Sequence, residues 1–250
     1  MSTRNQTTRD KPPAGPSIIA DYRLQPGVPD EMIAPDGKVR PGWAQLMAAF
    51  DKLGPTELVA RFERADQYLR DAGVFYRKYD GAEGKERAWP LAHVPLLIDE
   101  ADWSRISAGL VQRAELLETV IADIYGDNLL VQQGLLPPEL VARNGEFLRP
   151  LVGVKPVSGH YLHFCAFELG RGPDGAWWVL GDRAQAPSGA GFALENRVAT
   201  TRALSDIYAD MNVQRLAGFF RDFRDTLFAQ ARRDGGRVGI LTPGQLNETY

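Results

Sequence analysis

Residues 180–197 have the sequence LGDRAQAPSGAGFALENR, and the interpretation of the whole chain begins there. At its centre, Ser188, Gly189, Ala190 and Gly191 place small residues between a predicted strand and a predicted helix. Small residues allow backbone N–H groups to approach an anion, and Ser188 adds a hydroxyl donor. A helix beginning near Phe192 would direct its positive end toward the same anion. The pattern therefore predicts a phosphate-binding loop, with an ordinary glycine-rich turn as the alternative.

Charged and polar side chains are unusually dense around this loop. Such density favours a functional site over a plain turn, although the loop alone leaves both interpretations open. The residues concerned are Asp182, Arg183, Gln185, Glu195, Asn196 and Arg197.

A β-hairpin is predicted directly before the loop. Residues 161–169 and 176–182 have strand-like patterns, and the turn sequence GRGPDG at 170–175 separates them. This arrangement would bring Glu168 and Asp182 to the same edge of the hairpin. Paired carboxylates are suitable ligands for Mg²⁺, so we expect the two to share one metal ion. The alternative is that both are solvated acids at strand ends.

The remaining chain predicts a largely helical first half and a mixed second half. Residues 1–17 are predicted to be a disordered tail, 18–146 a mainly helical region, and 147–250 an incomplete α+β portion. Strands are expected at 147–155 and 238–241. Apolar residues recur with helical spacing in five segments, at 43–53, 56–71, 102–125, 192–204 and 212–232.

Composition excludes several classes of protein. The net charge of −3 across 250 residues argues against nonspecific nucleic-acid binding, which needs a basic surface. No run of about 18 apolar residues predicts a membrane span, and the start of the chain lacks a signal-peptide pattern. Cys165 is the only cysteine, so neither an internal disulfide nor a cysteine zinc cluster can form. We expect a cytoplasmic protein with no nucleic-acid or membrane partner.

The segment 181–197 resembles the circularly permuted ATP-grasp type 2 family, whose members are relatives of glutathionylspermidine synthase. The resemblance extends over most of the chain from about residue 22. It includes DGKVRPGW at 36–43, AGVFY at 72–76, GLVQRAELLETVIADIYG at 109–126, QGLLPPEL at 133–140 and LTPGQLNETY at 241–250. The resemblance implies an ATP-grasp-like α+β fold.

The same resemblance implies a function for the longer protein of which this chain would be the N-terminal part. That function is ATP- and Mg²⁺-dependent ligation of a carboxylate to an amine through an acyl phosphate, giving an amide or peptide bond. The implied partners are ATP, an unidentified acid and amine, and transglutaminase-like or helical proteins. By position, the resemblance assigns metal binding to Glu168 and Asp182, ATP binding to Ser188, Gly189, Ala190, Gly191 and Asn196, and charge neutralisation to Arg183 and Arg197.

One departure from the family pattern affects the predicted metal site. Many relatives have Glu-x-Asn on the second strand, where this chain has Gly181, Asp182 and Arg183. Three explanations stay open: fewer groups hold the metal, Arg183 takes over part of its work, or the site is degenerate.

Two further expectations concern one helix and the activity of the chain. Gln112 and Arg113 are either part of a solvated helix face or a contact to substrate. The 250-residue chain alone is expected to have no ligase activity. The alternatives to a ligase are a catalytically degenerate nucleotide-binding or scaffold module, and an interaction protein in which SGAG is only a turn.

Overall fold

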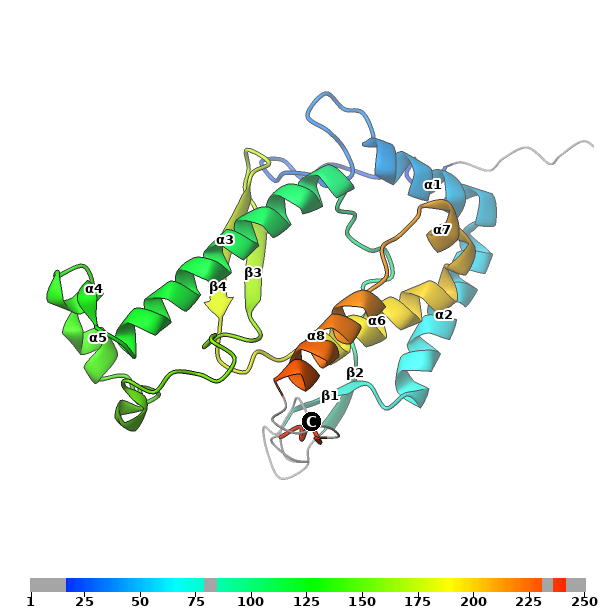
Figure 1. Ribbon diagram of the computed structural model, residues 1–250. Helices are drawn as coiled ribbons and strands as arrows, with labels where there is room; N and C mark the ends of the chain where they lie inside the picture. Colours follow the sequence, from blue (N-terminus) through cyan, green and yellow to red (C-terminus); the bar gives the residue numbers. More distant parts are fainter. Residues whose placement is uncertain (1–16, 79–84, 231–235, 242–250) are drawn as a thin grey trace, which may run out of the picture. The chain divides into compact units, whose positions relative to one another are not determined.

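The computed structural model describes residues 17–78, 85–230 and 236–241 and shows a mixture of helices and two-stranded sheets (Figure 1). The strands form two sheets of two strands each, β1 (Phe75–Lys78) with β2 (Lys85–Ala88), and the antiparallel hairpin of β3 (Ala166–Arg171) with β4 (Trp177–Arg183). The helices are α1 (Pro41–Leu53), α2 (Pro55–Asp71), α3 (Glu100–Ile124), α4 (Leu129–Gln132), α5 (Pro138–Ala142), the 3₁₀ turn η1 (Arg149–Leu151), α6 (Ala190–Ala203), α7 (Ser205–Asp210) and α8 (Ala217–Ala229).

Local sequence signals explain where the main helices begin and end. Pro41 and Pro55 occupy the first positions of α1 and α2, where their missing N–H costs nothing. Gly54 lies between the two helices with φ 78° and ψ 163°. The α3 helix begins after Asp99, whose carboxylate accepts a hydrogen bond from the N–H of Asp102 at 2.7 Å. The predictions of helices at 43–53, 56–71, 102–125 and 192–204 are confirmed.

The chain divides into two compact units that interleave along the sequence. The first unit contains the described residues up to Phe75, together with Arg87–Leu97 and Glu195–Gln214. The second unit contains Ile98–Leu194, together with the described residues of Tyr76–Glu86 and those from Arg215 onward. The sequence-based division into the consecutive regions 1–17, 18–146 and 147–250 stays a prediction. Residues 1–16 of the predicted tail lie outside the described residues.

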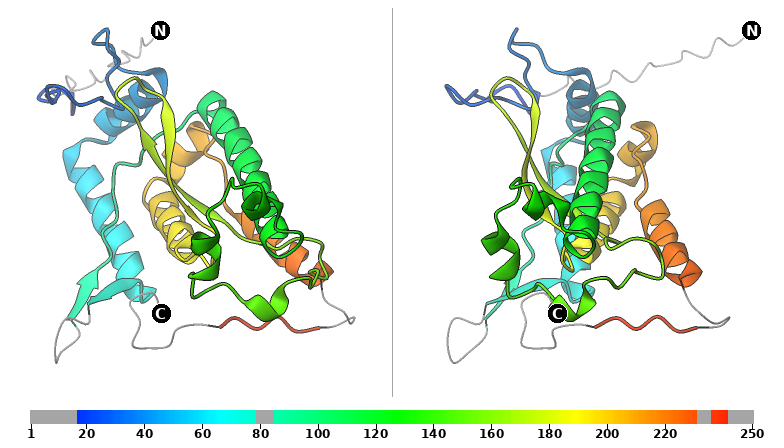
Figure 2. Two further views of the ribbon diagram at one scale, coloured as in Figure 1. Left: turned by 90° about the vertical axis from the view of Figure 1, so that its left-hand side faces the viewer. Right: turned by 60° about the vertical axis from the view of Figure 1, so that its left-hand side comes forward.

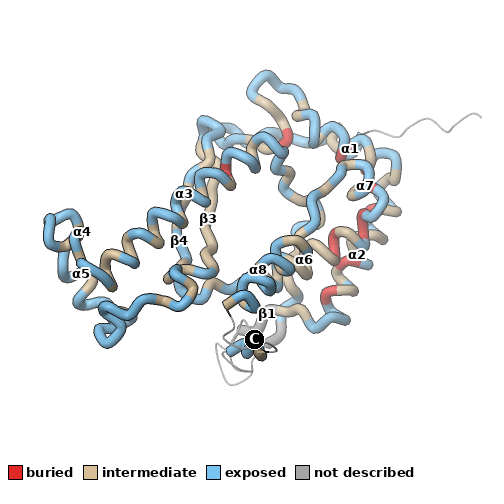
Figure 3. The backbone as a smooth tube through the Cα atoms, in the orientation of Figure 1, coloured by how far each residue is buried: buried red, intermediate tan, exposed pale blue. Residues whose placement is uncertain are grey.

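Nearly all buried apolar side chains belong to the first unit. They lie mainly on α1, α2, α7 and the part of α6 in this unit, where the tube of Figure 3 is red. Phe50, Leu46, Leu69 and Leu204 are the largest fully buried side chains. Each such side chain contributes about 1.5–3 kcal/mol of hydrophobic stabilisation. This core fixes α2 and the second part of α6 against each other.

In the second unit, the long α3 helix runs beside the hairpin of β3 and β4 (Figures 1 and 2). Arg171 on β3 pairs with Asp102 on α3 at 3.1 Å, which ties the two elements together. Ile106 is the one buried apolar residue among the described residues of this unit. Polar contacts therefore carry much of the attachment between helix and hairpin.

Two strand predictions are wrong, and one helix prediction is wrong in part. Residues 147–155 form η1 and turns, because Pro150 and Gly153 interrupt the apolar run. Residues 238–241 are exposed and form no strand. The last helix begins at Ala217, well after Asn212, which has a left-handed φ of 50°. None of the helices in the described ranges has the length and apolar character needed to cross a membrane.

Candidate functional site

The register of the β3–β4 hairpin determines which side chains share a face. Phe167 pairs with Asp182 and Glu168 with Gly181, but Leu169 pairs with Val179. Leu180 is therefore an extra residue in β4, a β-bulge. An extra residue shifts the alternation of faces, because side chains on a strand alternate with a period of two. Asp182 consequently shares a face with Phe167, whereas Glu168 lies on the opposite face.

On the face toward α3, Asp182 makes a two-point ion pair with Arg113. Arg113 Nε donates to Asp182 Oδ1 at 2.6 Å, and its Nη2 donates to Oδ2 at 2.7 Å. These bonds stabilise the ionised carboxylate and lower the pKa of Asp182. The same pair raises the pKa of Arg113. Arg113 thus contacts a hairpin side chain and is more than part of a solvated helix face.

On the outer face, Glu168 pairs with Arg183. Arg183 Nε donates to Glu168 Oε1 at 2.8 Å, and its Nη2 contacts the same oxygen. Gly181 leaves room for this carboxylate, because a Cβ added there would lie only 3.3 Å from Glu168 Oε2. The glycine that departs from the family pattern therefore has a packing explanation. Trp178 and Leu180, at 59% and 70% exposure, also lie on this open face.

The structure does not bring Glu168 and Asp182 together on one face of the hairpin. Each carboxylate is held by its own arginine, and the described residues contain no group of three or more side chains able to hold a metal ion. This arrangement does not fit a Mg²⁺ ion shared by the pair. A metal role for either residue stays a proposal, and no reaction step is derived through it.

The glycine-rich segment fits an anion better. Ser188 and Gly189 precede α6, and Ala190 and Gly191 form its first turn. First-turn N–H groups have no intrahelical acceptor. In the described parts of the chain, the N–H groups of these four residues have no hydrogen-bond acceptor. A Cβ added at Gly189 or Gly191 would meet nothing within 4 Å, so the space beside these two residues is open.

Backbone strain occurs just before this segment. Ala186 has φ 39°, a left-handed conformation that L-residues with a side chain rarely adopt. The following Pro187 restricts Ala186 further. Strained residues cluster at ligand clamps, where the surrounding structure holds them. Gln185 beside it donates to Glu146 Oε2 at 2.8 Å, which anchors the segment to the 144–147 turn.

Asn196 and Arg197 belong to the first unit, in which they connect elements of the core. Trp89 Nε1 donates to Asn196 Oδ1 at 2.6 Å, and Arg197 Nη1 donates to the carbonyl of Gln214 at 2.7 Å. The neighbouring Glu195 accepts a 2.7 Å hydrogen bond from the hydroxyl of Tyr68. The sequence interpretation missed Tyr68 and Trp89, because no local pattern marks an aromatic residue as the partner of a distant helix. The nucleotide role predicted for Asn196 stays a proposal.

Comparison with known proteins extends these observations. Residues 95–250 match the family described as circularly permuted ATP-grasp type 2. An uncharacterized protein of Synechocystis sp. is 33% identical over 88% of this chain and 46% of its own length. Two uncharacterized proteins of Mycobacterium tuberculosis are 32% and 30% identical, covering 92% and 98% of this chain but 27% and 45% of their own lengths. The chain therefore spans less than half the length of these relatives.

Proposed function

This chain belongs to the circularly permuted ATP-grasp type 2 family, and on that premise we propose that it contributes to an ATP-dependent ligase joining a carboxylate to an amine. Membership of an ATP-grasp family indicates ATP-dependent ligase activity in general, with ATP and Mg²⁺ as the usual cofactors. The proposal adds that the acid is activated as an acyl phosphate and that the product is an amide or peptide bond.

One observation carries this proposal within the structure. The N–H groups of Ser188, Gly189, Ala190 and Gly191 lack acceptors in the described parts of the chain and lie at the beginning of a 14-residue helix. Free donors at a helix beginning stabilise phosphate, because the peptide dipoles add to the hydrogen bonds. We assign phosphate binding to this segment, which we call the Ser188–Gly191 loop (residues 188–191).

The neighbouring hairpin supplies the charged groups of the proposal. Bound ATP would supply the phosphoryl group that activates the acid. Arg183 is 65% exposed on its side chain and can exchange Glu168 for an acyl phosphate, whose charge a planar guanidinium binds at two oxygens. Glu168 would then lose its arginine partner. In this arrangement, Asp182 stays in its ion pair with Arg113.

The partners and location in this proposal follow from the family. The substrates are an unidentified acid and amine, and transglutaminase-like or helical proteins are the proposed protein partners. We propose a cytoplasmic location with no nucleic-acid partner, in line with the net charge of −3. The match to this chain covers less than half of the length of these relatives. The activity of the whole protein is therefore also part of the proposal.

ATP binding tests the role of the loop. Gly191→Val adds a side chain where the protein leaves open space, so the fold tolerates it while the approach of a phosphate is blocked. We expect the affinity of the chain for MgATP, measured by calorimetric titration, to fall at least tenfold. Gly109→Val, on α3 with equally open space, is the matched control and should bind like the parent. Equal affinities for the parent and Gly191→Val would contradict the loop assignment.

A second candidate function is a nucleotide-binding or scaffold module without catalysis. It is favoured by the observation that both hairpin carboxylates are occupied by arginines. Release of inorganic phosphate in the presence of ATP, a panel of acids and a panel of amines separates the two candidates. A module that binds MgATP but releases no phosphate with any pair, even when the protein has the full length of its relatives, is a scaffold.

A further inference from the structure

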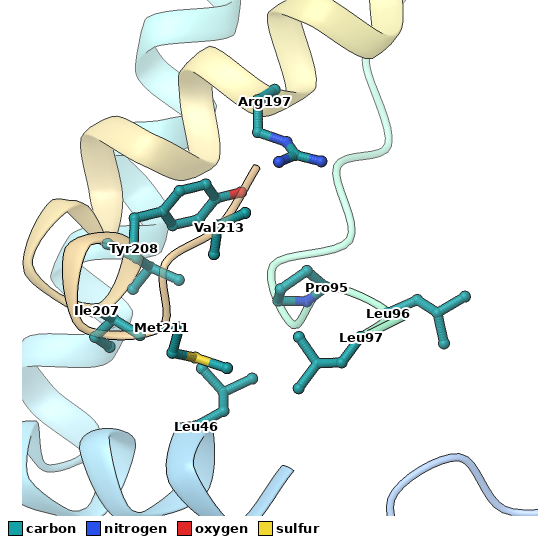
Figure 4. A pocket seen from close by; sticks show the side chains of 10 residues that line it. Leu46, Pro95, Leu96, Leu97, Arg197, Ile207, Tyr208, Met211 and Val213 are labelled. Carbon is teal, nitrogen blue, oxygen red and sulfur yellow. The ribbon is translucent and has the colours of Figure 1, made fainter. Parts of the chain in front are cut away.

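Within the first unit, a small cavity lies beside α6 and α7 and has two chemically different ends (Figure 4). Arg197 extends toward one end, and the apolar side chains of Leu46, Leu97 and Met211 lie at the other. Tyr208 lies between them, and its ring carries the only other polar group among the cavity-lining side chains. Ligand sites commonly combine an apolar lining with one or two convergent polar groups.

The charge of Arg197 is not neutralised by a neighbouring acid in the described part of the chain. Its Nη1 donates to the carbonyl of Gln214, and its Cζ lies 5.8 Å from the ring centroid of Tyr208. Neither contact removes the positive charge. A guanidinium has five N–H donors, so most of them stay available for a ligand. The hydroxyl of Tyr208 likewise has no partner among the described residues.

The size of the cavity limits the ligand. Its volume is about 80 Å³, less than the roughly 150 Å³ of a closed apolar cavity that holds benzene, but it is partly open to solvent. A ligand of about six to eight non-hydrogen atoms is therefore enclosed only in part. The apolar end excludes a sugar or a phosphate ester as occupant, because their hydroxyl and phosphate oxygens would be buried without hydrogen bonds. The charged end calls for an anion.

We propose that this cavity binds a small carboxylic acid with a short branched or linear alkyl chain. The alkyl chain occupies the apolar end, and the carboxylate accepts hydrogen bonds from Arg197 and from the hydroxyl of Tyr208. A carboxylate suits the guanidinium because the two planar groups form parallel hydrogen bonds. The inference concerns binding alone and requires neither ATP nor ligase activity, so it stands or falls separately from the proposed function.

The test uses 4-methylpentanoate as the probe, titrated against the 250-residue chain without ATP and followed by protein NMR. 4-Methylpentan-1-ol, with the same chain and no charge, and acetate, with the charge and almost no chain, are the reference ligands. We expect the pentanoate to bind at least tenfold more tightly than either. Equal affinities for the acid and the alcohol would contradict the proposed role of Arg197. Equal affinities for the pentanoate and acetate would contradict the proposed role of the apolar end.

Variants then separate the two ends of the cavity. Arg197→Met should weaken binding of the pentanoate at least tenfold and leave binding of the alcohol unchanged, which also shows that the variant is folded. Arg202→Met is the matched control, because Arg202 lies on the same helix and stacks on Tyr68 instead. Val213→Phe, which fills the cavity from its wall, should abolish binding of acid and alcohol alike. Unchanged pentanoate affinity in Arg197→Met or in Val213→Phe overturns the proposal.

Discussion

Gly54 has a backbone conformation that residues with a side chain rarely adopt. With φ 78° and ψ 163°, Gly54 both ends α1 and directly precedes α2. A Cβ there would meet no neighbouring atom within 4 Å, so any penalty arises in the backbone itself. We expect Gly54→Ala to lower the free energy of unfolding by about 1–3 kcal/mol, measured by urea denaturation.

The same substitution at Gly42 is the control. Gly42 lies in the first turn of α1, and an added Cβ would touch only Leu97 Cδ1 at 3.8 Å, an ordinary contact. Gly42→Ala should raise the free energy of unfolding by about 0.5–1 kcal/mol, because alanine favours the helix. Loss of stability of similar size in both variants would mean that the conformation of Gly54 is not the cause.

The Asp182–Arg113 ion pair makes a pH-dependent contribution to stability. Because the hydrogen bonds from Arg113 lower the pKa of Asp182, the stabilisation is present above the ordinary value of 3.8 and is lost as the pH falls through the lowered pKa. Asp182→Asn should therefore cost up to about 1 kcal/mol at pH 7 and nothing at a pH well below 3.8. Urea denaturation at several pH values measures this difference.

Glu168→Gln is the comparison for that experiment. The Glu168 and Arg183 side chains are 50% and 65% exposed, whereas Asp182 is 24% exposed. Solvent screens the more exposed pair more strongly, so its removal should cost less at pH 7. An equal or larger cost for Glu168→Gln would contradict the placement of Asp182 on the face toward α3.

At the scale of elements, the hydroxyl of Tyr68 on α2 holds α6 through Glu195. The hydrogen bond of 2.7 Å to the carboxylate raises the pKa of Tyr68. Tyr68→Phe should cost about 1.5–3 kcal/mol in the free energy of unfolding, as expected for a hydrogen bond to a charged group. Tyr208→Phe, on α7 in the same unit, removes a hydroxyl that has no partner among the described residues and should be neutral. Thermal or urea unfolding of both variants distinguishes them, and equal losses would contradict this role for Tyr68.

Helices were predictable from the sequence, and contacts between elements were not. Proline and glycine positions and helical spacing located α1, α2, α3 and α6 closely, because those signals are local. The bulge at Leu180 left no local signal, since it is defined only by the pairing with β3. The carboxylates of Glu168 and Asp182 were therefore expected on one edge, and the register separates them. A substrate contact was one of the two interpretations of Arg113. Its actual partner, Asp182 on the hairpin, could not be predicted from the spacing of residues in the sequence.

At the scale of the whole molecule, the two units differ in how their stability arises. Eleven of the twelve buried apolar residues lie in the first unit, and Ile106 alone lies in the second, among the residues described. Segments with few buried contacts open more readily than the rest of a protein. Hydrogen exchange followed by mass spectrometry should find slow exchange in α1 and α2 and faster exchange in α3 and the β3–β4 hairpin. Uniform protection across both units would contradict this view of the core.

The bulge in β4 also bears on how relatives should be aligned. At about 30% identity, a gap placed one position away within Trp177–Arg183 is a small change in an alignment. It does, however, equate an inward residue of one protein with an outward residue of another. The Gly181-Asp182-Arg183 sequence could then be scored as the loss of an acidic residue when the acid has moved to the other side of the ribbon. Columns covering this strand are better compared by the direction of their side chains than by their order, and the presence of a basic partner at the position of Arg113 is a usable marker of that direction.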